Sequence, residues 1–158
     1  MKVRKNKMAL VSFVLVVCLL GMYGCVKEKP KNPTVQEISE RVQQGVDLSA
    51  LQVADYPKLK KLYGISRAEI EDFVLYRAPS NIKADEIAII KVKDPKYLEG
   101  VKEKILKRAD RQATSFRGYV PEEYYLIQKK IIRVRGDYIL FAVSKDADKI
   151  AGIFKECI

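Results

Sequence analysis

Two segments restrict the fold of this chain more than any other feature, 86–92 and 138–144. Both are rich in strand-forming residues and are apolar at odd and at even positions. Successive side chains of a strand point to opposite faces, so both faces of these strands must be covered by other parts of the chain. We therefore expect a sheet against which helices pack.

Helical periodicity and capping residues indicate where those helices lie. Thr34 and Glu37 form a capping box at the start of the first helix, and Asp94 with Pro95 begins the longest one. A second capping box, Ser66 with Glu69, opens a short helical turn. The expected helices span about 34–45, 55–63, 95–115, 121–127 and 147–154.

The remaining strands complete an α+β domain. Strands are predicted at 73–78 and 131–135 as well, and Gly136-Asp137 is a two-residue hairpin loop. The strands thus fall into two groups joined by a long helical crossover. The predicted fold class is α+β, with a four-stranded, largely antiparallel sheet packed with helices and preceded by a signal peptide.

The N-terminus has the layout of a secretory signal, with four basic residues in Met1–Lys7 followed by the apolar stretch Met8–Tyr23. As a helix this stretch reaches about 24 Å, short of the roughly 30 Å hydrocarbon core. It ends in Gly24-Cys25, which resembles the bacterial lipobox, although Tyr23 is bulkier than the usual small residue. We expect Cys25 to carry the lipid; the alternative is an uncleaved membrane anchor.

These features predict a signal peptide over 1–24, a spacer over 25–33 and a single α+β domain over 34–158. Residues 1–24 hold four of the 30 Lys and Arg residues and none of the 20 acids, so their removal lowers the net charge from +10 to +6. The expected location is the outer face of the bacterial cytoplasmic membrane. There the basic excess meets anionic lipid, wall polymer or envelope protein, and we expect no nucleic-acid partner.

A set of residues along the domain matches those of a known family. They are Ala84-Asp85-Glu86-Ile87-Ala88, Lys91, Lys93, Asp94, Arg108, Gln112, Tyr119, Pro121 and Gly136-Asp137-Tyr138. In these residues the chain resembles an uncharacterised lipoprotein family of Gram-positive bacteria, catalogued only as a domain of unknown function. The resemblance covers roughly Thr34 to Phe154 and brings no catalytic residues. It implies a lipoprotein signal, because members of that family carry one.

Several kinds of chemistry are excluded by composition. The chain has no histidine, no CxxC pair and no Gly-rich phosphate loop, so no metal or other cofactor is expected. Cys157 is given no role. Carboxylates remain, and Glu86 and Glu123 are the only acids we would test for catalysis. Each is more simply explained as a structural residue at the start of a strand or helix.

The charge pattern of the longest helix suggests a contact surface. Lys104, Lys107, Arg108 and Arg111 gather on one flank, opposite the apolar stripe that includes Val101. Like charges at i,i+4 spacing repel, so this cluster does not stabilise the isolated helix, and replacing it with glutamine should cost the fold little. We take it as the partner-binding face; the simpler alternative is a solvated surface or pairing with acids elsewhere.

The leading hypothesis is therefore a non-catalytic, membrane-anchored binding module for an anionic or protein partner. Its rival is a carboxylate-dependent envelope hydrolase acting on glycan. A small-ligand receptor ranks last, because one domain has no second lobe to close over a solute.

Overall fold

The computed structural model describes residues 32–158, which form one compact unit. The predicted signal peptide, Cys25 and most of the spacer lie outside the described residues. Within 32–158, no helix is long and apolar enough to cross a membrane.

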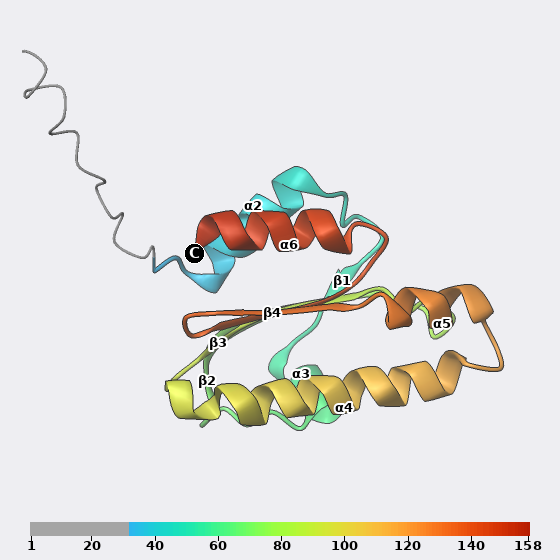
Figure 1. Ribbon diagram of the computed structural model, residues 1–158, viewed down its shortest axis with the longest axis horizontal. Coiled ribbons are helices and arrows are strands. Elements are labelled where there is room, and N and C mark those ends of the chain that lie inside the picture. The colour runs from blue at the N-terminus through green and yellow to red at the C-terminus, as the bar shows by residue number, and fades with distance from the viewer. Residues whose placement is uncertain (1–31) are drawn as a thin grey trace, which may run out of the picture. The chain divides into compact units, whose positions relative to one another are not determined.

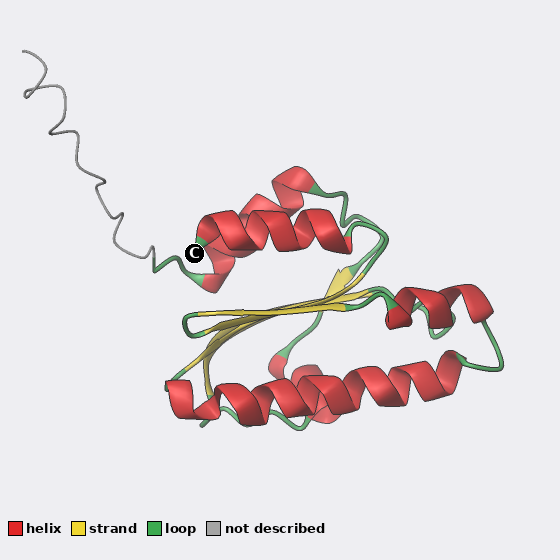
Figure 2. Ribbon diagram, in the orientation of Figure 1, coloured by secondary structure: helices red, strands yellow, loops and turns green. Residues whose placement is uncertain are grey.

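The strands, drawn in yellow in Figure 2, form a single sheet. They are antiparallel and lie in the order β1-β2-β3-β5-β4. The doubly apolar strand β3 lies at the centre, as predicted. Residues 32–158 hold five strands, so the predicted count of four is wrong. Their bounds are Gln52–Val53 (β1), Ile70–Arg77 (β2), Glu86–Val92 (β3), Ile131–Arg135 (β4) and Tyr138–Val143 (β5).

The missing strand, β1, is an edge strand of two residues that pairs with the end of β2 through Gln52 and Arg77. Both of its residues are exposed. Two exposed residues show no alternation of polar and apolar side chains, so no sequence pattern marks them as a strand.

Helices cover both faces of the sheet (Figure 1). The helices α2 and α6 lie on one face, and α3, α4 and α5 lie on the other. A short 3₁₀ helix, η1, leads into α4. The bounds are Val35–Gly45 (α2), Tyr56–Tyr63 (α3), Pro95–Tyr97 (η1), Leu98–Phe116 (α4), Pro121–Gln128 (α5) and Ala147–Cys157 (α6).

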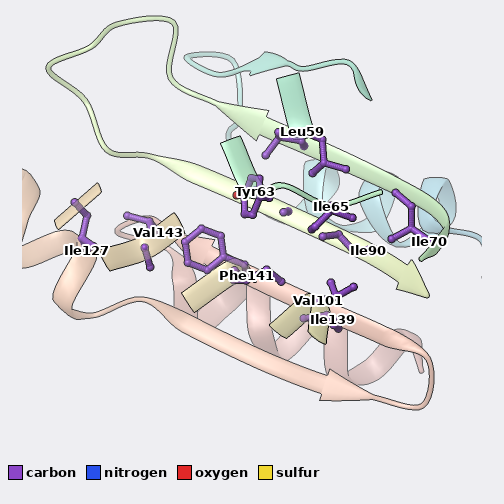
Figure 3. Close-up of a cluster of buried hydrophobic side chains, with 14 of the residues drawn as sticks. Leu59, Tyr63, Ile65, Ile70, Ile90, Val101, Ile127, Ile139, Phe141 and Val143 are labelled. Carbon is purple, nitrogen blue, oxygen red and sulfur yellow. The ribbon is translucent and has the colours of Figure 1, made fainter. Parts of the chain in front are cut away.

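The alternation of β3 divides the apolar core into two clusters. Ala88 and Ile90 point toward α4, where they join the cluster drawn in Figure 3, and Ile87 and Ile89 point toward α2 and α6. All four are fully buried. Burying one such large aliphatic side chain contributes about 1.5–3 kcal/mol, so both layers of helices are needed to keep the central strand out of water.

The helix and turn signals at Thr34, Gly64, Asp94 and Gly136 hold in the structure. Thr34 and Glu37 form the expected capping box, with Thr34 N donating to Glu37 Oε2 at 2.7 Å. Asp94 caps η1 by accepting from Lys96 N at 2.9 Å. Gly64 ends α3 at φ +71° and Gly136 turns the β4–β5 hairpin at φ +51°, left-handed conformations that glycine adopts without a steric penalty.

Candidate functional site

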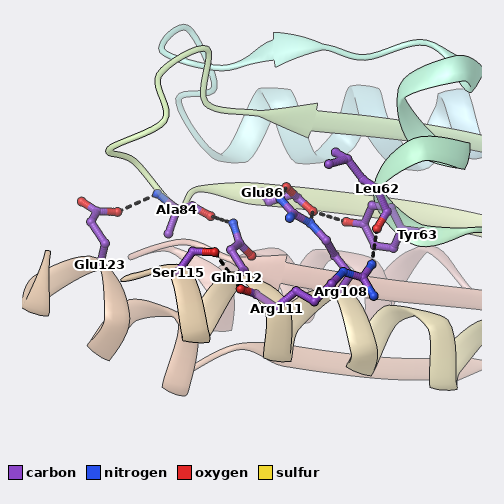
Figure 4. A network of polar contacts seen from close by, with 9 residues as sticks. All are labelled: Leu62, Tyr63, Ala84, Glu86, Arg108, Arg111, Gln112, Ser115 and Glu123. Carbon is purple, nitrogen blue, oxygen red and sulfur yellow. Dashed lines mark hydrogen bonds and ion pairs between the residues drawn. The ribbon is translucent and has the colours of Figure 1, made fainter. Parts of the chain in front are cut away.

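The start of β3 carries a buried ion pair. Glu86 alternates with Ala88 and Ile90, so its side chain points toward α4, and its relative exposure is 1%. Arg108 of α4 binds the carboxylate with two hydrogen bonds, Nε to Oε1 at 3.0 Å and Nη2 to Oε2 at 2.7 Å. The Tyr63 hydroxyl, from the end of α3, donates to Oε1 (Figure 4). Three elements thus meet at one carboxylate.

This network is held in a water-poor environment. Burial, together with the adjacent Glu86 charge, raises the pKa of Tyr63 well above its ordinary value, so Tyr63 stays a hydrogen-bond donor at neutral pH. A paired guanidinium and carboxylate with a further donor satisfy each other where water does not reach. Glu86 is therefore engaged as an acceptor on both oxygens and is poorly placed to exchange protons with a substrate.

A second carboxylate, Glu123, secures the loop that precedes β3. Its Oε2 accepts from Ala84 N at 2.7 Å, and its Oε1 pairs with Lys83 Nζ at 2.7 Å. Glu123 is 4% exposed and lies in the first turn of α5. Gln112 of α4 holds the other side of the same loop residue, because its Nε2 donates to Ala84 O at 2.9 Å. The loop is thereby fixed to both α4 and α5.

A pocket of about 310 Å³ opens beside this network. Its lining comes from the ends of β2 and α3, the 78–85 loop, the start of β3 and the C-terminal half of α4. The lining residues are Leu62, Arg77, Ala78, Ser80, Asn81, Lys83, Asp85, Glu86, Arg108, Gln112, Ser115 and Phe116.

Two buried polar atoms of pocket-lining residues have no hydrogen-bond partner among residues 32–158. They are Arg77 Nε and Gln112 Oε1, and both are buried. Arg77 pairs with Glu86 in the β2–β3 register, which places both side chains on the α4 face. An unsatisfied buried polar atom costs about 1–3 kcal/mol. We treat this pocket as the candidate site because Arg77, whose side chain has no partner within residues 32–158, lines it beside the Glu86–Arg108 pair.

Asp85 differs from the two glutamates. It is half-buried and lines the pocket. Burial, with a further contribution from the Glu123 charge, raises the pKa of its carboxyl above the ordinary value. The surroundings of Asp85 therefore disfavour its charged form.

The structure separates the four basic residues that the sequence grouped as one partner-binding face. Arg108 is occupied by Glu86. Lys104 Nζ lies 2.6 Å from Glu69 Oε2, and Arg111 Nη2 donates to Leu62 O at 2.5 Å. Lys107 is exposed and forms no ion pair or hydrogen bond within the described part of the chain. For Arg108, whose side chain is only 14% exposed, the structure shows the alternative named above, pairing with an acid elsewhere in the fold.

Glu69 shows how firmly Lys104 is held. Burial alone would raise the pKa of Glu69, but the hydrogen bonds from Lys104 and from the Ser66 amide lower it below its ordinary value. The second predicted capping box is present in part, since Ser66 N donates to Glu69 Oε2 at 2.7 Å. The residues it joins form a turn and not a helix.

Sequence reasoning singled out Glu86 but not its surroundings. One signal for these surroundings was available in the sequence. Arg108 and Gln112 lie four residues apart at the border of the apolar stripe of α4, a spacing that puts both side chains on the same side of the helix. Tyr63 and Arg77 gave none, because one ends a helix and the other ends a strand far away in the chain. Only the packing of α3, α4 and β2 brings them to Glu86.

No group of three or more His, Cys, Asp or Glu residues that could hold a metal ion is found in the described range 32–158. The polar side chains that line the pocket instead carry guanidinium, ammonium, amide, hydroxyl and carboxyl groups. They are suited to hydrogen bonding and charge pairing with a ligand.

Comparison with known proteins defines the class to which this fold and site belong. Residues 44–144 match the family described as "Domain of unknown function (DUF4358)", which covers the whole sheet together with α3, α4 and α5. The chain belongs to this family, as the resemblance to a domain of unknown function predicted. No curated protein and no solved structure matches the chain.

Proposed function

We propose that this protein is a lipoprotein anchored through Cys25 to the outer face of the bacterial cytoplasmic membrane, where its domain binds a partner without catalysis. The partner site is the pocket beside the Glu86–Arg108 pair. The observation that carries this proposal is a pocket whose lining includes Arg77, a residue whose side chain forms no hydrogen bond or ion pair within residues 32–158. An unpaired guanidinium beside a pocket favours a partner that carries hydrogen-bond acceptors or negative charge.

The position of the pocket suits a membrane-anchored domain. The first described residues contact the hairpin end of the sheet, where the Tyr138 hydroxyl donates to Asn32 Oδ1 at 2.7 Å. Tyr138 pairs with Lys91 near the end of β3, whereas the pocket lies at Glu86. Five residues of strand separate the two sites by roughly 17 Å. A domain tethered at the hairpin end would therefore present its pocket away from the tether.

Basic residues at the hairpin end favour attachment to an anionic membrane. Arg133, Arg135 and Lys155 line a second hollow of about 330 Å³ between β4 and α6. Arg135 Nη1 donates to Lys155 O at 2.9 Å, which holds the side chain against the end of α6. Each basic residue near an anionic surface contributes about 1 kcal/mol of attraction. These three would supplement a lipid anchor.

The rival function, a carboxylate-dependent hydrolase of envelope glycan, is favoured by one observation, the raised pKa of Asp85 beside the pocket. Such hydrolysis commonly uses two free carboxyl groups on either side of the scissile bond. Glu86 and Glu123 are both engaged in hydrogen bonds, so Asp85 lacks a second acid. Release of reducing sugar from purified wall glycan by wild type, and its loss in Asp85→Asn, would establish the rival.

Anchoring is tested by labelling cells with a radioactive fatty acid. Wild type should incorporate label and Cys25→Ala should not, because lipid attachment requires the cysteine thiol. Cys25→Ala should also accumulate as a precursor of higher mass. Label in both proteins, or in neither, would refute the lipoprotein assignment.

Partner binding is tested with a photoreactive amino acid placed at Asn81, on the pocket rim, in cells. A matched position is Lys107, which is exposed on α4 and does not line the pocket. We expect a crosslinked partner at Asn81 that disappears when Arg77→Gln is added. A partner captured only at Lys107 would restore the helix face as the binding surface, and no product at either position would refute a binding module.

A further inference from the structure

The hollow between β4 and α6 gathers three cations on one surface. Its volume is about 330 Å³, and its lining consists of Arg133, Arg135, Ala151, Phe154 and Lys155. The three cations are exposed, whereas Phe154 is fully buried. No acid of residues 32–158 belongs to this lining. We call this site the basic hollow, and a ligand can reach each of its charged side chains from solvent.

The register of the sheet explains why the two arginines lie together. Arg133 and Arg135 pair with Leu140 and Tyr138 of β5, whose side chains belong to the core cluster on the α6 face. Side chains at i and i+2 of a strand point to the same face and start about 7 Å apart. Both arginines therefore leave β4 on the α6 face. Arg135 is held there, because its Nη1 donates to Lys155 O at 2.9 Å.

The domain does not neutralise the charges of the basic hollow. None of its three cations forms an ion pair with another residue of the described range 32–158. Asp137 and Glu156, the acids nearest to it in the sequence, do not line it. Within that range each arginine donates one hydrogen bond, to a backbone carbonyl oxygen. A guanidinium carries five N–H donors, so most of them are left for a ligand.

Phosphate is the anion that this arrangement fits. A guanidinium fork binds two phosphate oxygens with parallel hydrogen bonds. The oxygens of a phosphate point in several directions, so two arginines on long side chains can bind one group together, whereas the two oxygens of a carboxylate lie in one plane. Three positive charges without an acid also repel a ligand that carries an ammonium group beside its phosphate. The favoured ligand thus has a phosphate and no cation.

The position of the basic hollow favours membrane lipid as the source of that phosphate. Arg135 pairs with Tyr138, whose hydroxyl donates to Asn32 Oδ1 at 2.7 Å, so the hollow lies beside the start of the described chain (Figure 1). Seven residues lead from Cys25 to Asn32, and an extended chain of that length spans at most about 25 Å. In a protein anchored at Cys25, the hollow therefore stays within reach of the bilayer surface.

We infer that the basic hollow binds the phosphate of one anionic phospholipid, with the forks of Arg133 and Arg135 on its oxygens and Lys155 adding charge. This differs from a general attraction of basic residues to an anionic surface, because it requires these positions and one lipid per chain. The bound headgroup holds the hairpin end of the sheet at the bilayer. The choice of lipid as the source rests on the proposed anchoring at Cys25.

The test is native mass spectrometry of the full chain, purified from bacterial membranes in an uncharged detergent, with phosphatidylglycerol added at increasing concentration. A site gives one bound lipid per chain, whereas diffuse attraction gives a spread of adducts with no preferred number. Phosphatidylcholine has the same phosphate next to an ammonium group and should bind about ten-fold more weakly or less. The mass of the chain itself shows whether Cys25 carries its own lipid.

Variants then locate the bound lipid. Arg133→Gln with Arg135→Gln should weaken phosphatidylglycerol binding by about ten-fold or more, because one charge-assisted hydrogen bond is worth about that factor. Arg133→Lys with Arg135→Lys keeps the charge without the forks and should weaken binding less. The matched control, Lys129→Gln with Lys149→Gln, removes two exposed cations outside the hollow and should leave binding unchanged. Thermal melts report the fold of each variant, and the lysine variant serves as the comparison if the glutamine variant melts low.

Specific results would overturn the inference. Equal binding of phosphatidylcholine, or equal losses in the arginine and control variants, would show diffuse attraction. Displacement of the lipid by equimolar inorganic phosphate would assign the site to free phosphate, and displacement by an equimolar tetraglutamate peptide would assign it to an acidic protein.

Failure of the inference can be told apart from failure of the proposed anchoring. A chain that carries lipid on Cys25 but binds no phosphatidylglycerol refutes the inference alone. A chain without lipid on Cys25 that still binds one phosphatidylglycerol through its arginines refutes the anchoring and supports the phosphate site. Absence of both refutes both.

Discussion

Removing the positive charge of Arg108 should destabilise this domain more than any other change to the basic residues of α4. Arg108→Gln leaves the Glu86 carboxylate, 1% exposed, with hydrogen bonds but no opposite charge. Breaking a buried ion pair on one side costs about 3–5 kcal/mol. For a domain of about 130 residues this lowers the melting temperature by roughly 10–20 °C. The cost comes from the charge left behind and not from the area of the side chain.

The double variant Glu86→Gln, Arg108→Gln tests that reasoning directly. With both charges removed, no buried ion remains, so the double variant should be more stable than the single variant Arg108→Gln. Urea unfolding of residues 32–158 at neutral pH, followed by circular dichroism, measures all the variants. Lys107→Gln is the matched control and should stay within about 0.5 kcal/mol of wild type, because it is an exposed side chain.

Two results would refute this account. One is Arg108→Gln unfolding within about 1 kcal/mol of wild type, which would mean that Glu86 is solvated or protonated without loss. The other is a double variant whose cost equals the sum of the two single costs, which would mean that the residues do not interact. The sequence alone predicted that replacing residues 104, 107, 108 and 111 together with glutamine would cost the fold little, and the structure changes that expectation. That variant should now melt much lower than wild type, chiefly through Arg108.

Three further predictions concern the domain of residues 32–158. Asp85→Asn should raise stability at neutral pH, by less than about 1 kcal/mol because the group is half exposed. The pKa of Asp85 in the folded state lies above its ordinary value of 3.8. The folded state therefore loses stability as the pH rises from 3.8 through the folded pKa. Below about pH 3.8 the carboxyl is protonated in both states, so thermal melts there should show no gain from Asp85→Asn. Gly64→Ala should lower the free energy of unfolding in urea by about 1–2 kcal/mol, because φ is +71° at this position. Gly100→Ala in α4 is the control and should not lower it. Equal losses in both variants would show that the left-handed backbone at Gly64 is not the cause. Chelator should leave the melting temperature unchanged, and a clear fall in scanning calorimetry would show a metal site that the sequence does not predict.

The secondary structure followed closely from the sequence because its signals are local. The capping box of Thr34, the glycine that ends α3 and the Asp94-Pro95 start all act within one helical turn. Apolar residues at both odd and even positions of β3 predicted a central strand covered on both faces, and the sheet order confirms its central position. Where local information was weak, as for the two exposed residues of β1, the strand was missed and the count of four was wrong.

By itself, therefore, the sequence determined the fold class, the extent of most elements and membership of a family of unknown function. It also predicted a lipid anchor at Cys25, which remains a proposal. Only the tertiary structure decided which charges are free. Helical periodicity places Arg108 at the edge of the apolar stripe of α4. A long side chain at such an edge can extend into water or bind a buried acid, depending on which residues lie opposite it. Here Glu86 lies opposite, 22 residues away in the chain, and the side chain of Arg77 is left without a partner among residues 32–158.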